Sequence, residues 1–250
     1  MTRGRLALTI VAGLAVFLVV LFFYLPASWF RSYLPPGVSC ADVGGSVWAG
    51  ECIGLTVQGS KLGDATWNLS ATSALGRQLA GDVDVRGAQA QGHADIDFSL
   101  KSGSGELRNV RGQFPLDHGF LAQFPRDRRA RVALDVKRAV VTDTAIKQLE
   151  GTVELHDFEQ LAPRPLALGS YRVAFDGVAT PDGKLPGKVT DLGGPFRLEG
   201  TLTLIPPNQW QFEGYITGRT ADAERLLRQE LPYAAPDASG RTLISFEGAY

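Results

Sequence analysis

The sequence predicts a mainly β protein, with a single N-terminal transmembrane helix followed by a curved antiparallel β-sheet and one or two short helices. Three observations support this prediction. Residues 6–25 carry no charge, apolar and polar residues alternate with a period of two after residue 37, and turn-forming residues separate the alternating stretches. The sheet is expected to form a sandwich or an open groove.

The uncharged run over residues 6–25 is long enough to cross a membrane. At about 1.5 Å of rise per residue, a helix of this length spans roughly 30 Å, the thickness of the hydrocarbon core of a bilayer. Arg3 and Arg5 precede the run and only Arg31 follows it closely. By the positive-inside rule this asymmetry places the N-terminus in the cytoplasm, so residues 1–5 are expected to be a cytoplasmic stub.

A cleaved signal peptide is the alternative interpretation of this N-terminus. The apolar region of a signal peptide is usually about 7–15 residues long and ends at a cleavage site of the A-x-A type. Here the run is longer, and its exit, Leu25-Pro26-Ala27-Ser28, is a poor cleavage site because of the proline and the bulky leucine. The sequence therefore favours an uncleaved anchor over residues 6–25 and a juxtamembrane segment over residues 26–36.

The charge composition does not indicate a nucleic-acid partner. The chain has 25 basic and 26 acidic residues, a net charge of −1, and no block of like charges. Neither nucleic acid nor an anionic membrane surface is implied by such a balance. The roughly 215 residues that follow the anchor are enough to bury a hydrophobic core.

Cys40 and Cys52 are the only cysteines, and both lie on the expected translocated side. An oxidising compartment favours a disulfide between them. Gly44 and Gly45 allow a tight turn, so a hairpin could bring the two sulfur atoms together across antiparallel strands. Two free thiols are the alternative, and a metal site is not favoured because no further ligands lie nearby. In the loop-entropy model such a disulfide contributes about 3 kcal/mol.

Alternating stretches indicate strands with one buried face and one wet face. They lie at residues 95–100, 132–136, 153–156, 171–175, 202–204 and 210–212. Clusters of glycine, proline and polar residues separate them, for instance at residues 102–105 and 181–183. Residues 37–250 are therefore predicted to form one β-rich domain.

Two short segments are predicted to be helical. The clearer one, over residues 221–231, can be capped by Thr220 or Asp222 and ends before Pro232, and its leucines share one face. The other, over residues 116–124, lies between two prolines. Both are expected to plug gaps or ends of the sheet.

The histidines do not form a predicted metal site. His93, His118 and His156 are the only three, and no pair of them has the spacing of metal ligands. His93 and His156 fall on predicted strands, and His118 falls in the predicted second helix. Each is interpreted as a surface histidine.

Two pairs of aspartates are the remaining candidates for acid chemistry. Asp82 with Asp84, and Asp95 with Asp97, have i, i+2 spacing on strands, which places each pair on a wet sheet face. No nucleophile elbow, P-loop or dinucleotide-binding motif occurs. The sequence therefore predicts a protein that is not an enzyme and has no catalytic, cofactor-binding or metal-binding residues.

Several short motifs follow the apolar run in a particular order. They are residues 34–38 (LPPGV), 43–50 (VGGSVWAG), 62–69 (LGDATWNL), 168–172 (LGSYR), 194–200 (GPFRLEG) and 240–241 (GR). In this order and spacing they resemble inner-membrane protein N of the bacterial type II (general) secretion pathway. The resemblance extends over nearly the whole chain and rests on the order of the motifs, since none of them is specific alone.

The resemblance implies a single-pass protein of a Gram-negative inner membrane, with its N-terminus in the cytoplasm and residues 37–250 in the periplasm. It implies a non-catalytic interaction module whose partners are the other inner-membrane platform proteins. Such a module supports the export of folded periplasmic proteins across the outer membrane. The family offers no catalytic residues to carry over. The cysteine pair departs from the family pattern, which leaves open whether its hairpin is cross-linked throughout the family.

Lipid binding in the cell envelope is the alternative function. A long, curved antiparallel sheet anchored at a membrane can expose an apolar trough instead of closing a core. Six apolar residues of the predicted strands would line such a groove, namely Leu100, Val132, Leu134, Val173, Phe175 and Leu204. In the opposite interpretation the same residues fill a sealed interior.

Overall fold

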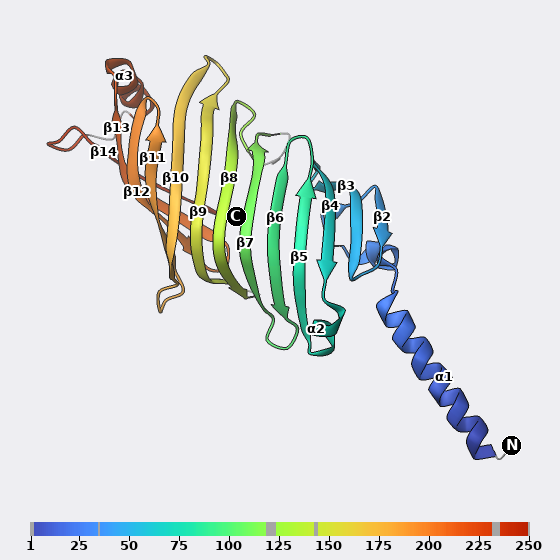
Figure 1. Ribbon diagram of the computed structural model, residues 1–250. Coiled ribbons are helices and arrows are strands. Elements are labelled where there is room, and N and C mark those ends of the chain that lie inside the picture. The colour runs from blue at the N-terminus through green and yellow to red at the C-terminus, as the bar shows by residue number, and fades with distance from the viewer. Residues whose placement is uncertain (1–2, 35, 119–123, 143–144, 232–235, 250) are drawn as a thin grey trace.

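The computed structural model of the chain contains one 14-stranded sheet (Figure 1). The structure describes residues 3–34, 36–118, 124–142, 145–231 and 236–249. The first elements are α1 (Arg3–Phe23), the 3-10 helix η1 (Ala27–Tyr33), β1 (Val38–Ser39), β2 (Asp42–Gly45), β3 (Ala49–Val57), β4 (Ser60–Leu69), α2 (Ala71–Leu75), β5 (Gln78–Arg86) and β6 (Gln91–Ser99). The later elements are β7 (Ser104–Leu116), β8 (Arg128–Thr142), β9 (Ala145–Gln160), β10 (Leu166–Val178), β11 (Leu185–Gly193), β12 (Phe196–Ile205), β13 (Gln209–Gly218), α3 (Ala221–Glu230) and β14 (Thr242–Ala249).

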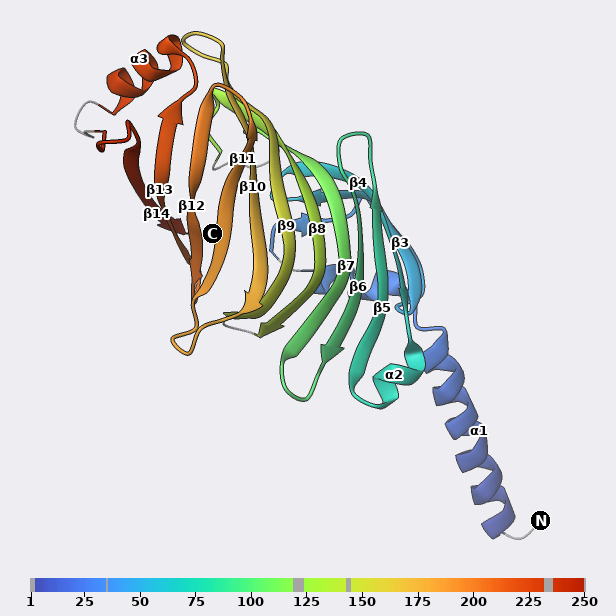
Figure 2. The ribbon, with the colours of Figure 1, turned by 60° about the vertical axis from the view of Figure 1, so that its left-hand side comes forward.

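Each strand from β3 to β13 pairs with its successor in the chain, so the sheet is an antiparallel meander. β1 and β2 both pair with β3, towards opposite ends of that strand. The prediction of a mainly β, antiparallel fold is confirmed, and of the two expected forms the sheet takes the open one. Figure 2 shows the sheet curving into a trough, with α3 at its far end and α1 projecting from its first strands.

The sheet is a single layer, and its surface area reflects this. The accessible surface is 16060 Å², whereas a compact monomer of 26.9 kDa exposes about 10,800 Å². In the part of the chain that the structure describes, α3 lies against the sheet at one end of it, and no layer of helices covers either face (Figures 1 and 2). The protein thus leaves more surface accessible than a compact monomer of the same mass would, and the projecting helix α1 is part of this excess.

Helix α1 covers most of the run that the sequence analysis assigns to a membrane anchor. Within the described ranges, no helix reaches the combined length and hydropathy of a membrane-crossing segment. The transmembrane helix over residues 6–25 therefore stays a prediction.

The short helices match the expectations only in part. α3 begins after Thr220, whose hydroxyl accepts a hydrogen bond from the amide of Ala223, and Leu231 is its C-cap, as the capping pattern predicts. The helix expected over residues 116–124 is wrong at its first residue, because Leu116 is still paired with Ala130 in the ladder between β7 and β8. Residues 119–123 lie outside the described residues. α2 was not predicted from the sequence.

The end of α1 is joined to the first hairpin of the sheet. The indole nitrogen of Trp48 donates a hydrogen bond of 2.6 Å to the carbonyl of Phe22, and the two rings lie 4.8 Å apart. The amide of Val47 donates to the carbonyl of Leu25 at 2.9 Å. Trp48 thus satisfies one of the carbonyls that the last turn of a helix leaves without an intrahelical partner. The turn between β2 and β3 holds the helix by side-chain and backbone contacts together.

Cys40 and Cys52 meet beside this junction. Their sulfur atoms lie 2.04 Å apart and their Cα atoms 5.5 Å apart, at a sequence separation of 12. Both side chains are buried with Ala65 in a small cluster, and Trp67 is among the residues that pack against it. A disulfide at this position ties the segment before β2 to β3.

We expect the double substitution Cys40→Ser with Cys52→Ser to lower the free energy of unfolding by about 3 kcal/mol, because the unfolded chain loses a closed loop. Urea denaturation followed by tryptophan fluorescence measures the change. The wild-type chain in a reducing agent is the control and is expected to lose the same amount. Equal stability of the variant and the oxidised wild type would show that the two thiols are not cross-linked in the protein.

Candidate functional site

The alternation of side chains stays in phase across thirteen strands, from β2 to β14. Residues joined by the strand register point to the same side of a sheet. One register row contains only apolar residues and glycine: Val43, Cys52, Ala65, Val85, Gly92, Gly112, Leu134, Val153, Val173, Val189, Gly200, Gly214 and Ile244. We call the side of the sheet that carries this row the inner face.

The adjacent register row faces the other way and is mostly polar. It contains Gly44, Glu51, Thr66, Asp84, His93, Arg111, Asp135, Thr152, Ala174, Lys188, Thr201, Glu213 and Ser245. We call this side the outer face. Cross-strand ion pairs lie on it, for example Arg111 with Asp135 at 3.8 Å. Exposed pairs of this kind contribute little stability each, so the outer face is a solvated surface.

The inner face is hollowed in the C-terminal half of the sheet. A groove of about 790 Å³ lies over β8 to β14 and is closed at one end by α3 and by the loop before β10. Its floor includes the buried side chains of Val189, Phe212 and Ile244. Volumes of this size are typical of small-molecule sites. We refer to this hollow as the apolar groove.

Glycines shape the floor of the apolar groove. Gly200 and Gly214 face each other across β12 and β13. A Cβ atom on Gly200 would lie 2.8 Å from the ring of Phe212, and one on Gly214 would lie 2.7 Å from it. The missing side chains therefore leave the space in which the Phe212 ring lies flat against the sheet.

Helix α3 supplies one wall of the groove. Leu226, Leu227 and Leu231 line it, while the charged residues of the helix face away or lie at the rim. Asp222 and Glu224 are in the first turn and Arg228 is in the last, which complements the helix dipole. The amphipathic pattern of α3 is thus used to cover one end of the trough.

Two arginines lie at the same end of the groove as α3. Arg128 begins β8, and Arg164 lies in the loop before β10. Both side chains are exposed. The lining of the groove contains two acidic residues, Glu230 at the end of α3 and Glu154, and Glu154 is paired with Arg172 at 2.7 Å. Glu230 is therefore the one acidic residue of the lining that is left to offset the two arginines.

Tyr171 lines the groove, and its hydroxyl is held by a hydrogen bond within β10. Its hydroxyl donates a 2.6 Å hydrogen bond to the carbonyl of Leu168, across the irregular register near Gly169. Burial, with the negative charge of Asp191 as a second cause, raises the pKa of Tyr171 to about 12. Asp191 is itself paired with Arg219 at 2.5 Å.

The predicted groove residues are not all in one place. Val132 and Val173 line the apolar groove. Phe175 is buried against Gly187, and Leu134 belongs to the same inner row but lies outside the groove. Leu100 is 59% exposed in the turn after β6, so its assignment to a groove is wrong. Leu204 lies outside the groove and pairs with Leu185 and Trp210 at the opposite end of β12.

None of the three histidines is among the residues that line the groove. His93 contacts Asp84 and Asp95, both at 3.2 Å, on the outer face. His156 pairs with Glu154 at 2.9 Å. His118 lies in a turn after β7 rather than in a helix, 3.0 Å from the carbonyl oxygen of Phe124.

The paired aspartates also lie on the outer face. Asp82 is opposite Asp95, and Asp84 is opposite His93, in the ladder between β5 and β6. The amide of Asn109 donates to Asp95 at 2.6 Å and is the main cause that lowers the pKa of this carboxyl. Among the described residues, no group of three or more acidic, histidine or cysteine side chains is arranged to hold a metal ion.

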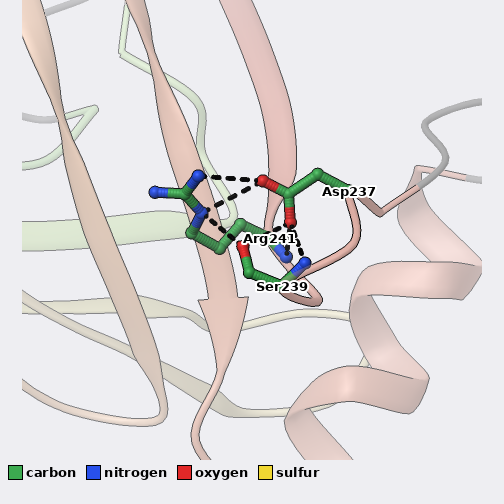
Figure 3. A network of polar contacts seen from close by, with 3 residues as sticks. All are labelled: Asp237, Ser239 and Arg241. Atoms are coloured by element: carbon green, nitrogen blue, oxygen red, sulfur yellow. Dashed lines mark hydrogen bonds and ion pairs between the residues drawn. The ribbon is translucent and has the colours of Figure 1, made fainter.

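A polar turn precedes the last strand (Figure 3). The carboxylate of Asp237 accepts hydrogen bonds from the amides of Ser239 and Arg241 and from the Ser239 hydroxyl, at 2.6 to 2.9 Å. These contacts, led by that hydroxyl, hold the pKa of Asp237 well below its usual range. The guanidinium of Arg241 lies 4.4 Å from the ring centre of Tyr215. The turn thus fixes where β14 begins.

The comparison with known proteins gave one family. The sequence model described as "Type II secretion system (T2SS), protein N" matches residues 36–245. Neither the curated proteins nor the solved structures gave a match. The matched range contains the strands from β1 to β13 and the first half of β14, and the sequence resemblance to this family is confirmed.

We expect Tyr171 to ionise near pH 12. Because the folded state holds the phenol proton more tightly than the unfolded chain, this residue stabilises the fold fully below pH 10 and loses that contribution as the pH rises towards 12. The phenolate absorbance of the wild type minus that of Tyr171→Phe isolates this titration. A difference spectrum with a midpoint near 10 would contradict the buried, hydrogen-bonded hydroxyl.

Proposed function

The chain belongs to the family of protein N of the type II secretion system, and we propose that it acts as a non-catalytic interaction module of the inner-membrane platform. Family membership makes it a component of type II secretion that interacts with other components of that system. In the proposed role it supports the export of folded periplasmic proteins across the outer membrane. The match over residues 36–245 is the observation that carries this proposal.

The proposed topology is a single span with a cytoplasmic N-terminus. Support comes from the uncharged run over residues 6–25 and from Arg3 and Arg5 before it. Residues 26–36 would then be juxtamembrane, and residues 37–250 would form the periplasmic domain. An anchor of this kind raises the effective concentration of the sheet near membrane-bound partners.

The junction with α1 supports a fixed orientation of the sheet on the membrane. Trp48 and Val47 hydrogen-bond to the last carbonyls of the helix and to the segment just after it. Pro26 forms an isolated bridge with Ser46, and Trp67 donates from its indole to the carbonyl of Val47 at 3.0 Å. A helix held through so many contacts acts as a rigid support and not as a flexible tether.

The free edge of β14 is the proposed contact for a partner strand. β14 pairs with β13 on one side, and on its other side the described residues place only Pro236 opposite Thr242. The strand has eight residues, no proline and one charged residue, Glu247. Edges without protecting charges or prolines readily accept a further strand, whose backbone hydrogen bonds supply affinity.

We expect deletion of the gene to leave exported proteins folded but stranded in the periplasm, and the wild-type gene to restore export. Ser245→Lys is expected to reduce this rescue several-fold, because a charged side chain on an edge strand obstructs strand addition. The measurement is the amount of active exported protein in the medium and in the periplasmic fraction.

Thr201→Lys is the matched control for the edge. Thr201 lies in the same outer row as Ser245 and is also exposed, but on the interior strand β12. It is expected to rescue export as well as the wild type. Full rescue by both variants would remove the β14 edge from the proposal, and normal export in the deletion strain would remove the role in secretion.

We expect a reporter enzyme that is active only in the periplasm to be active when fused after Tyr250. The same reporter fused before Met1 is expected to be inactive, because the arginines hold that end in the cytoplasm. Retention of residues 1–27 in the mature protein, measured by mass spectrometry, distinguishes the anchor from a signal peptide. Loss of those residues would overturn the anchor.

A further inference from the structure

The floor of the apolar groove offers an occupant no hydrogen bonds. Val173, Val189, Leu198, Leu202 and Phe212 present only hydrocarbon side chains there. The backbone groups beneath them are already paired in the ladders between β10 and β13. An extended peptide would bury amide groups without partners, at a substantial cost in free energy. A hydrocarbon chain carries no such groups and loses nothing.

The charges at one end of the groove indicate which head group the bound molecule carries. Arg128 and Arg164 are exposed at the rim, outnumber Glu230 there, and have no side-chain ion pair among the described residues. A guanidinium binds a phosphate through two parallel hydrogen bonds. An apolar channel that ends at two free guanidinium groups is complementary to an amphiphile with an anionic head.

We propose that the apolar groove binds an anionic phospholipid, with an acyl chain on the floor formed by β10 to β13 and the phosphate at Arg128 and Arg164. The groove volume of about 790 Å³ lies in the range of small-ligand sites, so the proposal places one acyl chain in the groove rather than the whole lipid. The proposal depends on the groove alone and holds whether or not the chain acts in secretion as proposed above.

The inner face also indicates where the lipid comes from. Its apolar register row begins at Val43 and Cys52, in the hairpin that contacts the end of α1. The row then continues without a charged residue to Val189 and Ile244 in the groove floor. If α1 lies in a membrane, the nearest amphiphile to this face is a membrane phospholipid.

The test uses the full chain reconstituted in nanodiscs of phosphatidylcholine that contain a few per cent of phosphatidylglycerol. The phosphatidylglycerol carries a photoreactive group near the end of one acyl chain. After illumination, mass spectrometry maps the cross-linked peptides. We expect cross-links in β12 and β13. The same probe with a phosphatidylcholine head also carries a phosphate, but its choline cation is repelled by the two arginines, and we expect it to label these strands three- to ten-fold less.

Two matched pairs of variants separate the floor from the rim. Leu202→Trp fills the groove and is expected to abolish labelling of β13, whereas Thr201→Trp, on the outer face of the same strand, is expected to retain it. Arg128→Gln with Arg164→Gln is expected to remove the preference for the anionic head. Arg86→Gln with Arg197→Gln deletes two outer-face arginines and is expected to keep it. Circular dichroism checks that every variant is folded.

Three results would overturn the proposal. The first is labelling confined to α1 or to the outer face. The second is equal labelling of β12 and β13 by both head groups. The third is a bound polypeptide in the groove, detected by native mass spectrometry of the purified chain together with protection of these strands from the probe. Impaired export with normal lipid labelling, or the reverse, would separate the secretion role from lipid binding.

Discussion

One constraint governs this protein: the apolar and polar positions of thirteen strands must stay in phase. The period of a strand is two, so a slip of one residue in any ladder would turn all the later inner residues outward. Such a slip at β12, for example, would exchange Gly200 and Leu202 for Glu199 and Thr201 on the inner face. Because no second layer covers the sheet, this phase decides by itself which face can bury or bind hydrocarbon.

Local features of the fold were visible in the sequence, and non-local ones were not. The alternation around Val173 and the cap at Thr220 are decided by neighbours in the chain, and the strand and the helix are found there. Leu100 fits the same alternation as Phe98, but the strand ends at Ser99, before it. A pattern of period two cannot reveal where a hairpin turns, nor whether the sheet closes.

The site was harder to predict than the strands because it depends on curvature. Arg128 and Arg164 carry no local signal, since Arg128 is one of four arginines between residues 126 and 131 and Arg164 is a single arginine between two prolines. Both line the same end of the groove because Arg128 pairs with Gln160 at the end of β9 and Arg164 follows in the loop before β10. Tyr171 stands in an alternating stretch like any core residue. Its hydrogen bond to Leu168 depends on an irregular strand register that cannot be predicted from the sequence.

The meander has a consequence for how the chain acquires its structure. Each strand finds its partner in the segment made just before it, so no early strand waits for the C-terminus. Topologies dominated by neighbouring segments fold faster than those that must close long loops. A chain that emerges gradually, N-terminus first, can therefore lengthen its sheet one strand at a time from the Trp48 hairpin onward. Helix α3 and strand β14 complete the apolar groove, so the groove is the last part of the molecule to form.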